Sequence, residues 1–245
     1  MSKMLIQIPV LVKELDMYTP CVFIKGNKLQ QKNFEKLSNL IKKVIQTSQV
    51  HFMHPQQEKV IEALYFAAYK HRGIYRKDGY TPYLLHVIET VNILIDQSIL
   101  DYKVMIAAII HDVVEDTDAT KKEVCGKFGP KITRIVELLT KHPNFKKRLK
   151  YWFLIRNERD KNIRWRVIVI KFADRIHNVT TLDSIKKEAR AQKIKETLEE
   201  FPLLYKVLTK TLRQLHNEGI IEKDDYLQLP FHLSNRLFHE LGRFL

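Results

Sequence analysis

Residues 104–116 read VMIAAIIHDVVED, an apolar run that ends abruptly in ionisable side chains. The run predicts a buried helix over about Tyr102–Val114. On such a helix the residues at four-residue spacing share a face, namely His111 with Glu115 and Asp112 with Asp116. Four ionisable groups at the end of a buried helix are costly unless a partner satisfies them, and a divalent cation is such a partner. Imidazole and carboxylate ligands together suit Mn, Fe or Zn better than Ca or Mg.

Two further residues stand where other helices could complete a metal site. His86 lies in an apolar frame, and Asp174 follows the run Val167–Ala173, which only Lys171 interrupts. Each residue alone has an ordinary structural explanation, as a hydrogen-bonded core histidine or as a helix cap. Together with His111 and Asp112, however, they form a joint pattern that chance seldom produces. The sequence therefore predicts a metal site at the ionisable cluster around His111 and Asp112, and His86 and Asp174 could complete its shell from two other helices.

The rest of the chain predicts an all-α fold. Only 7 Gly and 8 Pro occur in 245 residues, and long stretches rich in Leu, Ile, Lys and Glu favour helices over a sheet with many tight turns. A loop is expected over Gly73–Pro82, and Gly126, Gly129 and Pro130 should break the short helix that Thr120 and Glu123 open. Helices are expected at about Leu29–Ile45, Gln56–His71, Tyr83–Asp96, Ile132–Lys141, Lys146–Lys161, Arg164–Asn178, Ser184–Glu200, Leu203–Asn217 and Leu233–Phe244.

Charge and composition restrict the class of protein. The formal net charge is +14, and residues 141–195 hold 17 Lys/Arg against 5 Asp/Glu, which places +12 in that segment. Such a field attracts polyanions, including nucleic acid, acidic lipid headgroups and nucleotide polyphosphates. Cys21 and Cys125 lie far apart in sequence and fit no metal-ligand spacing. A disulfide framework is therefore not expected, and a reducing cytoplasm is the expected compartment. No segment has the apolar length that would cross a bilayer, so no membrane partner is expected.

Longer strings around these residues resemble a known family. The order His, His-Asp, Asp on successive helices resembles the HD phosphohydrolase superfamily, and the strings resemble the hydrolase domain of the Rel/Spo alarmone enzymes and their small stand-alone relatives. The resemblance covers about residues 56–200. It rests on AYKHRG at 68–73, RKDG at 76–79, PYLLH at 82–86, AAIIHDVVEDT at 107–117, FG at 128–129, LTK at 139–141, IKFADRIHN at 170–178 and VTTL at 179–182.

This resemblance implies a site and a reaction. His86, His111, Asp112 and Asp174 match the ligands of one divalent metal, for which the family typically uses Mn²⁺. Glu115 and Asp116 match the catalytic acidic pair that positions and activates the attacking water. The positions that match substrate-binding residues are Arg76, Lys77, Lys171, Asn178 and Thr181, with the arginine stacking on guanine. The implied activity is the 3′-pyrophosphohydrolysis of (p)ppGpp to GDP or GTP and pyrophosphate, with no room for a synthetase domain.

The same resemblance predicts the organisation of the chain. We expect an HD-domain helical bundle at 56–200, an N-terminal extension with a helix at 1–55 and a C-terminal helical extension at 201–245. Two other functions stay open. One is an HD hydrolase of another ribose-phosphorylated nucleotide, such as ppApp or NADPH. The other is a non-catalytic module that binds nucleotide or nucleic acid, although a nucleic-acid partner is not favoured because the ligand positions are intact. A homo-oligomer is also left open.

Overall fold

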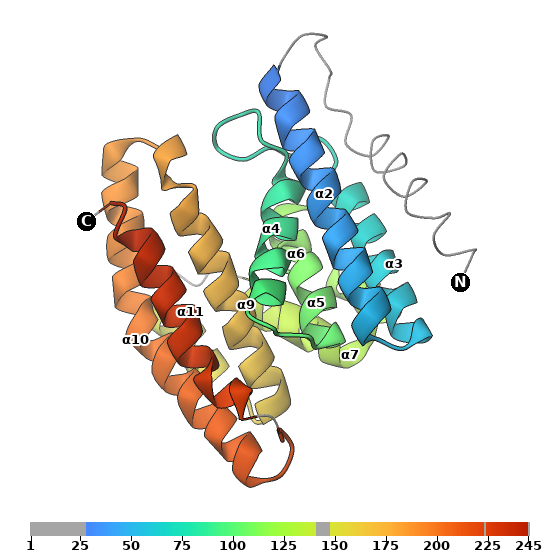
Figure 1. Cartoon of the computed structure of the whole chain (residues 1–245), viewed down its shortest axis with the longest axis vertical. Coiled ribbons are helices and arrows are strands. Elements are labelled where there is room, and N and C mark those ends of the chain that lie inside the picture. The colour runs from blue at the N-terminus through green and yellow to red at the C-terminus, as the bar shows by residue number, and fades with distance from the viewer. Residues whose placement is uncertain (1–27, 141–147, 223, 245) are drawn as a thin grey trace. The chain divides into compact units, whose positions relative to one another are not determined.

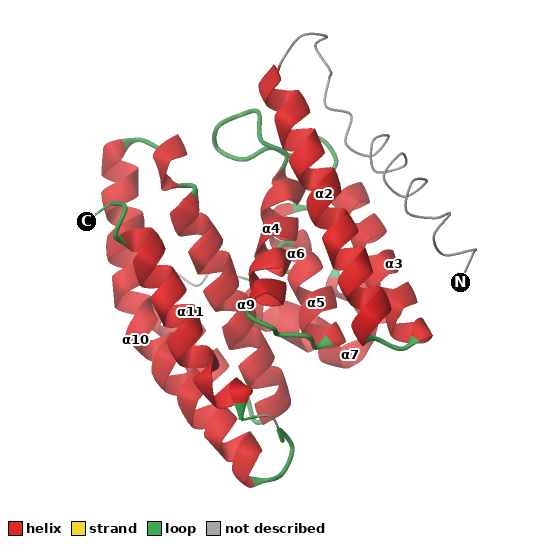
Figure 2. Ribbon diagram, in the orientation of Figure 1, coloured by secondary structure: helices red, strands yellow, loops and turns green. Residues whose placement is uncertain are grey.

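The computed structural model describes residues 28–140, 148–222 and 224–244, and every regular element in these ranges is a helix (Figures 1 and 2). An isolated bridge between Tyr75 and Pro82 is the only strand-like pairing among the described residues. The all-α prediction is therefore confirmed. The apolar segment Leu5–Val12, Cys21 and the start of the basic segment at 141–147 lie outside the described residues.

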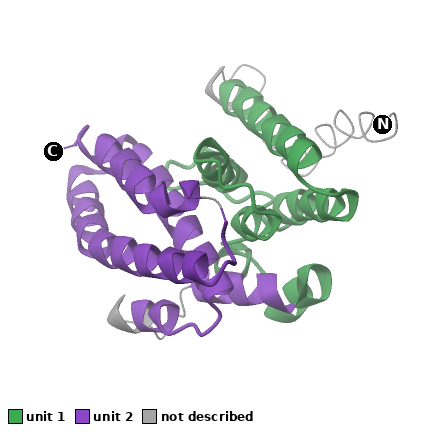
Figure 3. Ribbon diagram, turned by 60° about the horizontal axis from the view of Figure 1, so that its bottom comes forward, with its two compact units in different colours: residues 1–129 green, residues 130–245 purple. Residues whose placement is uncertain are grey.

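The chain divides into two compact units, residues 1–129 and 130–245, which Figure 3 shows in separate colours. The boundary falls inside α7 (Lys121–Leu139), where Gly129 has φ 82° and ψ 170°. These angles are not helical and are essentially restricted to glycine. The expected break at Gly129 and Pro130 is therefore confirmed, and α7 is two helices joined at a kink. The break expected at Gly126 is wrong, because this residue lies inside the first of the two helices.

Helix α2 packs on two neighbours in the first unit, α3 and α4, and α5 packs on the same two helices. Ion pairs from Lys36 to Glu89 and from Lys43 to Asp96 join α2 to α4. Asp101 caps α5 by accepting a hydrogen bond from the backbone N–H of Val104 at 2.9 Å. The described helices of this unit are α2 (Lys28–His51), α3 (His54–Lys70), α4 (Tyr83–Asp96), α5 (Tyr102–Ile109), α6 (Val113–Asp116) and the first part of α7.

Helix α9 (Lys161–Thr180) contacts the other main helices of the second unit, and its residues 167–177 are all buried. Arg164 ties it to α10 by donating to Thr211 at 2.9 Å and to Gln214 at 3.2 Å. A buried ion pair between Arg175 and Glu200 joins the same two helices. The other elements are α8 (Arg148–Arg156), η1 (Leu182–Ser184), α10 (Lys187–Asn217) and α11 (Asp225–Leu241).

Two expected helix boundaries in this unit were wrong. Helix α10 runs without interruption through Pro202, where two helices were expected, and α11 begins at Asp225 rather than near Leu233. Pro202 is exposed, whereas a buried stripe continues past it from Thr197 to Leu204 and beyond, so packing holds the helix together. The predicted domain boundary at residue 200 thus lies within a helix. The division at 55 and 200 stays a prediction.

Candidate metal centre

The HD doublet lies in a turn between two helices. Helix α5 ends at Ile109, and α6 begins only at Val113, so the single helix expected over Tyr102–Val114 is wrong. The Nδ1 of His111 lies 2.8 Å from the carbonyl oxygen of Ala108, which the backbone N–H of Asp112 would occupy in a continuous helix. The imidazole of His111 therefore hydrogen-bonds to a carbonyl in the last turn of α5 that would otherwise continue the helix. His111 and Glu115 do not share the face of one helix.

The turn brings His111 and Asp112 next to His86 from α4. One potential ligand atom from each of the three residues lies within 4.8 Å of the other two. The Oδ2 of Asp112 is 3.0 Å from Nε2 of His111 and 3.5 Å from Nε2 of His86. The two histidines are buried, and Asp112 is partly buried. The structure thus assembles three of the four residues that the sequence singled out as metal ligands.

Hydrogen bonds in this cluster leave atoms that can bind a metal available. Because a carbonyl oxygen only accepts, Nδ1 of His111 must carry the proton that it donates to Ala108, and a neutral imidazole then offers the lone pair of Nε2. Metal-bound histidines usually have this arrangement. Burial alone would raise the pKa of Asp112, but protonated His111 and His86 hold it well below its usual range through their positive charge and hydrogen bonds, and a metal cation at the two Nε2 atoms would act in the same direction. The site therefore offers two imidazoles and a carboxylate anion, a set that fits a transition-metal dication.

Sequence reasoning missed Tyr83 as part of this site. Its hydroxyl donates a hydrogen bond of 2.7 Å to Oδ2 of Asp112. Burial, followed by the negative charge of Asp112, raises the pKa of Tyr83, so the phenol stays protonated and remains a donor. The spacing of Tyr83 and His86 on α4 could have shown this, because residues three apart share a helix face.

The loop before α4 carries Arg76 and Lys77. The backbone N–H of Arg76 donates to the carbonyl of Thr81 at 2.8 Å, and its guanidinium carbon lies 5.5 Å from the centre of the Tyr83 ring. Burial would raise the pKa of Asp78, but the hydrogen bonds from Thr81 and Tyr80 lower it, so this carboxylate holds the loop closed. The loop thus places Arg76 beside Tyr83, while Lys77 is exposed.

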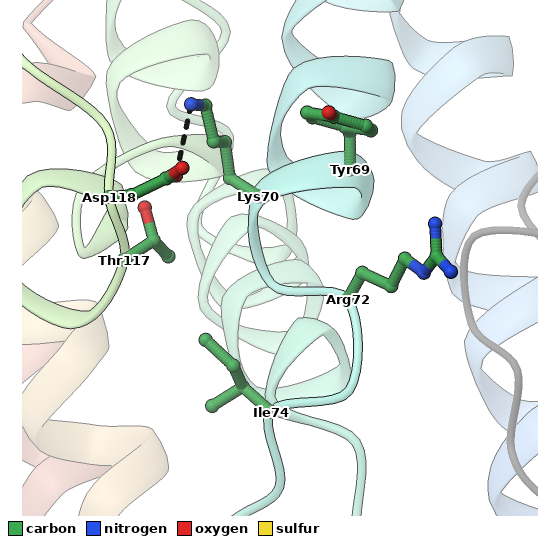
Figure 4. Close-up of a pocket in the computed structure, with 6 residues that line it drawn as sticks. All are labelled: Tyr69, Lys70, Arg72, Ile74, Thr117 and Asp118. Atoms are coloured by element: carbon green, nitrogen blue, oxygen red, sulfur yellow. Dashed lines mark hydrogen bonds and ion pairs between the residues drawn. The ribbon is translucent and has the colours of Figure 1, made fainter.

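The acidic pair follows the cluster directly. Glu115 and Asp116 are exposed on α6, and Thr117 continues the chain with its hydroxyl donating to the carbonyl of Val113 at 2.5 Å. Beyond them a cavity of about 320 Å³ lies between the end of α3 and residues 117–118 (Figure 4). Lys70 lines it and pairs with Asp118 at 3.0 Å, as the dashed line in Figure 4 shows. Its other lining residues are Tyr69, Arg72, Ile74 and Thr117.

The remaining predicted site residues lie in the second unit, three of them on α9 and Thr181 directly after its last residue. Asp174 accepts hydrogen bonds at both oxygens, from Lys171 at 3.0 Å to Oδ2 and from Asn178 to Oδ1. Lys171 and Asp174 are 4 % and 7 % exposed, so the lysine is a buried cation held by a buried carboxylate. The hydroxyl of Thr181 lies 3.3 Å from the carbonyls of His177 and Asn178. Helical spacing therefore joins three of these four residues, and the role of Asp174 as a fourth ligand stays a prediction.

Comparison with known proteins places the chain in a family. A family model described as HD domain matches residues 63–208, which contain all eleven predicted site residues. The chain belongs to the HD domain family. Membership in that family implies a divalent metal, and the cluster of His86, His111 and Asp112 is where the described residues could hold it.

Curated relatives of this HD protein are named as enzymes of (p)ppGpp. It is 34 % identical over 179 residues to the bifunctional (p)ppGpp synthase/hydrolase SpoT of Escherichia coli, an overlap of 71 % of this chain and 24 % of that protein. A guanosine-3′,5′-bis(diphosphate) 3′-pyrophosphohydrolase of Borreliella burgdorferi is 28 % identical over 225 residues, or 87 % of this chain and 31 % of that protein. The chain thus spans about a quarter to a third of the length of these relatives.

A solved structure also resembles this HD protein. It is that of a metazoan ortholog of SpoT that hydrolyses ppGpp and plays a role in starvation responses. The TM-score is 0.50 with 30 % sequence identity, and the match covers 73 % of this chain and 94 % of that one. The HD-domain helical fold is therefore shown by sequence and by structure. No described helix combines the length and the apolar character that crossing a membrane requires.

Proposed function

We propose that this protein is a metal-dependent 3′-pyrophosphohydrolase of (p)ppGpp. The observation that carries the proposal is the buried cluster of His86, His111 and Asp112, followed at once by the exposed acids Glu115 and Asp116. Relatives that are 28–34 % identical to this chain carry the name guanosine-3′,5′-bis(diphosphate) 3′-pyrophosphohydrolase. The products would be GDP or GTP together with pyrophosphate.

The proposed metal is one Mn²⁺ ion, held by His86, His111 and Asp112 with Asp174 as a fourth ligand. Such an ion would lower the pKa of a bound water to roughly 7 in a favourable site and would polarise a phosphoryl oxygen. Glu115 would accept the proton of the attacking water, and Asp116 would orient that water. Both side chains are exposed, so they are accessible to a substrate and its water from solvent.

The proposed substrate contacts are the residues that match the substrate-binding positions of the family. Arg76 would stack on the guanine, and Lys77 would meet the phosphates, since its exposed amino group can neutralise charge that builds up there. Lys171, Asn178 and Thr181 would lie near the nucleoside and the phosphates. Lys171 and Asn178 also donate to Asp174, so we propose that they orient this carboxylate in addition to any contact with substrate.

The experiment is to incubate the purified protein with ppGpp and Mn²⁺ and to measure GDP and pyrophosphate. Asp112→Ala and a chelator should abolish release, and Glu115→Gln should lower kcat by about 10²–10⁴-fold while Mn²⁺ still binds. A matched control is Glu62→Gln, which changes a partly exposed glutamate paired with Lys59 and should leave turnover unchanged. No turnover by folded, Mn²⁺-loaded protein would reject the proposal.

A substrate panel separates the closest alternatives. Parallel reactions with pppGpp, ppApp and NADPH decide which nucleotide is hydrolysed, because the metal cluster alone does not discriminate among them. Turnover of NADPH or ppApp without turnover of ppGpp would reassign the substrate. Strongly salt-dependent binding to generic RNA with no hydrolysis would indicate a binding module instead.

Two further expectations belong to this proposal. We propose a cytoplasmic setting, supported by the free, exposed thiol of Cys125. Light scattering of the purified chain tests whether it forms a homo-oligomer.

A further inference from the structure

Tyr83 lies at the point where the metal cluster and the substrate loop meet. It is the first residue of α4, directly after Pro82, and its side chain lies one turn before that of His86. Its hydroxyl donates to Oδ2 of Asp112 at 2.7 Å. This is the same oxygen that faces Nε2 of His111 at 3.0 Å. The phenol of Tyr83 therefore hydrogen-bonds to the same Asp112 oxygen that lies beside the two histidines of the cluster.

Three neighbours fix the ring that carries this hydroxyl. His71 stacks on it, with centroids 4.9 Å apart and planes inclined by 19°. His86 meets it edge-on at 5.5 Å and 80°, and the guanidinium of Arg76 lies 5.5 Å from the ring centre. Because the ring is held by the α3 terminus, by α4 and by the loop, the direction of the hydroxyl is fixed. In turn, the ring gives Arg76 a surface to rest on.

We propose that Tyr83 is a positioning residue with two separable actions. Its hydroxyl orients the carboxylate of Asp112 toward the metal, and its ring holds Arg76 in place for the nucleotide. This inference rests on the proposed function, because it takes Asp112 as a metal ligand and Arg76 as a substrate contact. Outer-shell partners that orient a ligand typically change metal affinity by about 10–100-fold when removed.

Two substitutions separate the actions. Tyr83→Phe removes the hydroxyl and keeps the ring, so Mn²⁺ binding measured by calorimetry on the full chain should weaken about 10–100-fold. At saturating Mn²⁺ its KM for ppGpp should equal that of the wild type. Tyr83→Leu removes the ring as well, so its KM should rise in addition to the loss of metal affinity. Tyr102→Phe is the matched control, since this half-buried tyrosine of the same unit packs against Phe52 and should change neither quantity.

The outcomes keep this inference apart from the proposed function. Wild-type Mn²⁺ affinity in Tyr83→Phe would overturn the role of the hydroxyl, and an unchanged KM in a folded Tyr83→Leu would overturn the role of the ring. His111→Ala tests the metal site itself. If that variant binds Mn²⁺ as the wild type does, the metal assignment fails. If it loses Mn²⁺ while Tyr83→Phe does not, only the inference about Tyr83 fails.

Discussion

Replacing Glu200 by leucine should strongly destabilise the second unit. Glu200 on α10 and Arg175 on α9 form an ion pair in which the residues are 7 % and 5 % exposed. Arg175 directly follows Asp174, so the pair also fixes the part of α9 that carries the predicted metal ligand. Removing the carboxylate leaves a guanidinium buried without its anion.

The expected cost follows from this burial. Breaking a buried pair by removing one partner costs about 3–5 kcal/mol, because the remaining charge stays desolvated. With a urea dependence of about 2 kcal/mol per M, that loss lowers the unfolding midpoint by roughly 1.5–2.5 M. The double variant Arg175→Met/Glu200→Leu removes both charges and keeps similar volume, so its stability should return to within about 1 kcal/mol of the wild type.

The assay is urea unfolding followed by tryptophan fluorescence. The protein has two tryptophans, Trp152 and Trp165, and both are buried within the second unit. Their emission therefore reports on the unit that contains the ion pair. Glu196→Leu is the matched control on the same helix, because Glu196 pairs with Lys193 at 3.9 Å near the surface and should cost less than about 1 kcal/mol.

The reasoning is refuted if Glu200→Leu lowers the free energy of unfolding by less than about 1 kcal/mol. It is also refuted if the double variant is no more stable than the single one, since the loss would then not come from an unpaired charge.

Three other changes test separate parts of the structure. Lys171→Met removes the cation that donates to Asp174 at 3.0 Å and should weaken Mn²⁺ binding about 10–100-fold by calorimetry; wild-type affinity would exclude Asp174 as an oriented ligand. Burial lowers the pKa of His71 from 6.5 to about 4. Between these two pH values His71 is therefore protonated in the unfolded chain but stays neutral in the folded chain. Stability should therefore fall by up to roughly 3 kcal/mol between pH 6.5 and 4, measured by amide exchange in α3 and α4, and an equal slope in His71→Phe would contradict this. Gly129→Ala introduces a side chain at φ 82° and ψ 170° and should lower stability by about 1–3 kcal/mol in thermal unfolding. Gly126→Ala lies inside a helix with open space around it and should raise stability by about 0.5–1 kcal/mol. Equal effects of the two substitutions would argue against the kink.

Local patterns were sufficient for the class of fold and for much of the candidate site. Helical periodicity and the scarcity of glycine predicted the all-α fold, because a helix forms its hydrogen bonds among neighbours in sequence. Ionisable residues in otherwise apolar segments pointed to His86, His111 and Asp112, since burying such groups needs a partner. The same logic drew attention to Asp174, and the structure shows that residue buried with Lys171 on one helix face.

The errors occurred where side chains compete with local backbone preferences. The break between α5 and α6 depends on an imidazole that takes the carbonyl of Ala108, and apolar periodicity carries no sign of that contact. Helix α10 continues through Pro202 because its buried stripe packs against neighbouring helices, although local propensity favours a stop there.

The sequence by itself thus determined the helical class, the family motifs and the residue types available for metal chemistry. The tertiary structure decided which of them meet: Tyr83 with Asp112, His71 with Tyr83, and Arg76 with the same ring. Helical periodicity shows which residues share a face, but contacts between helices depend on how they pack. Only packing shows that a tyrosine in an apolar frame carries a hydroxyl aimed at a carboxylate 29 residues away in sequence.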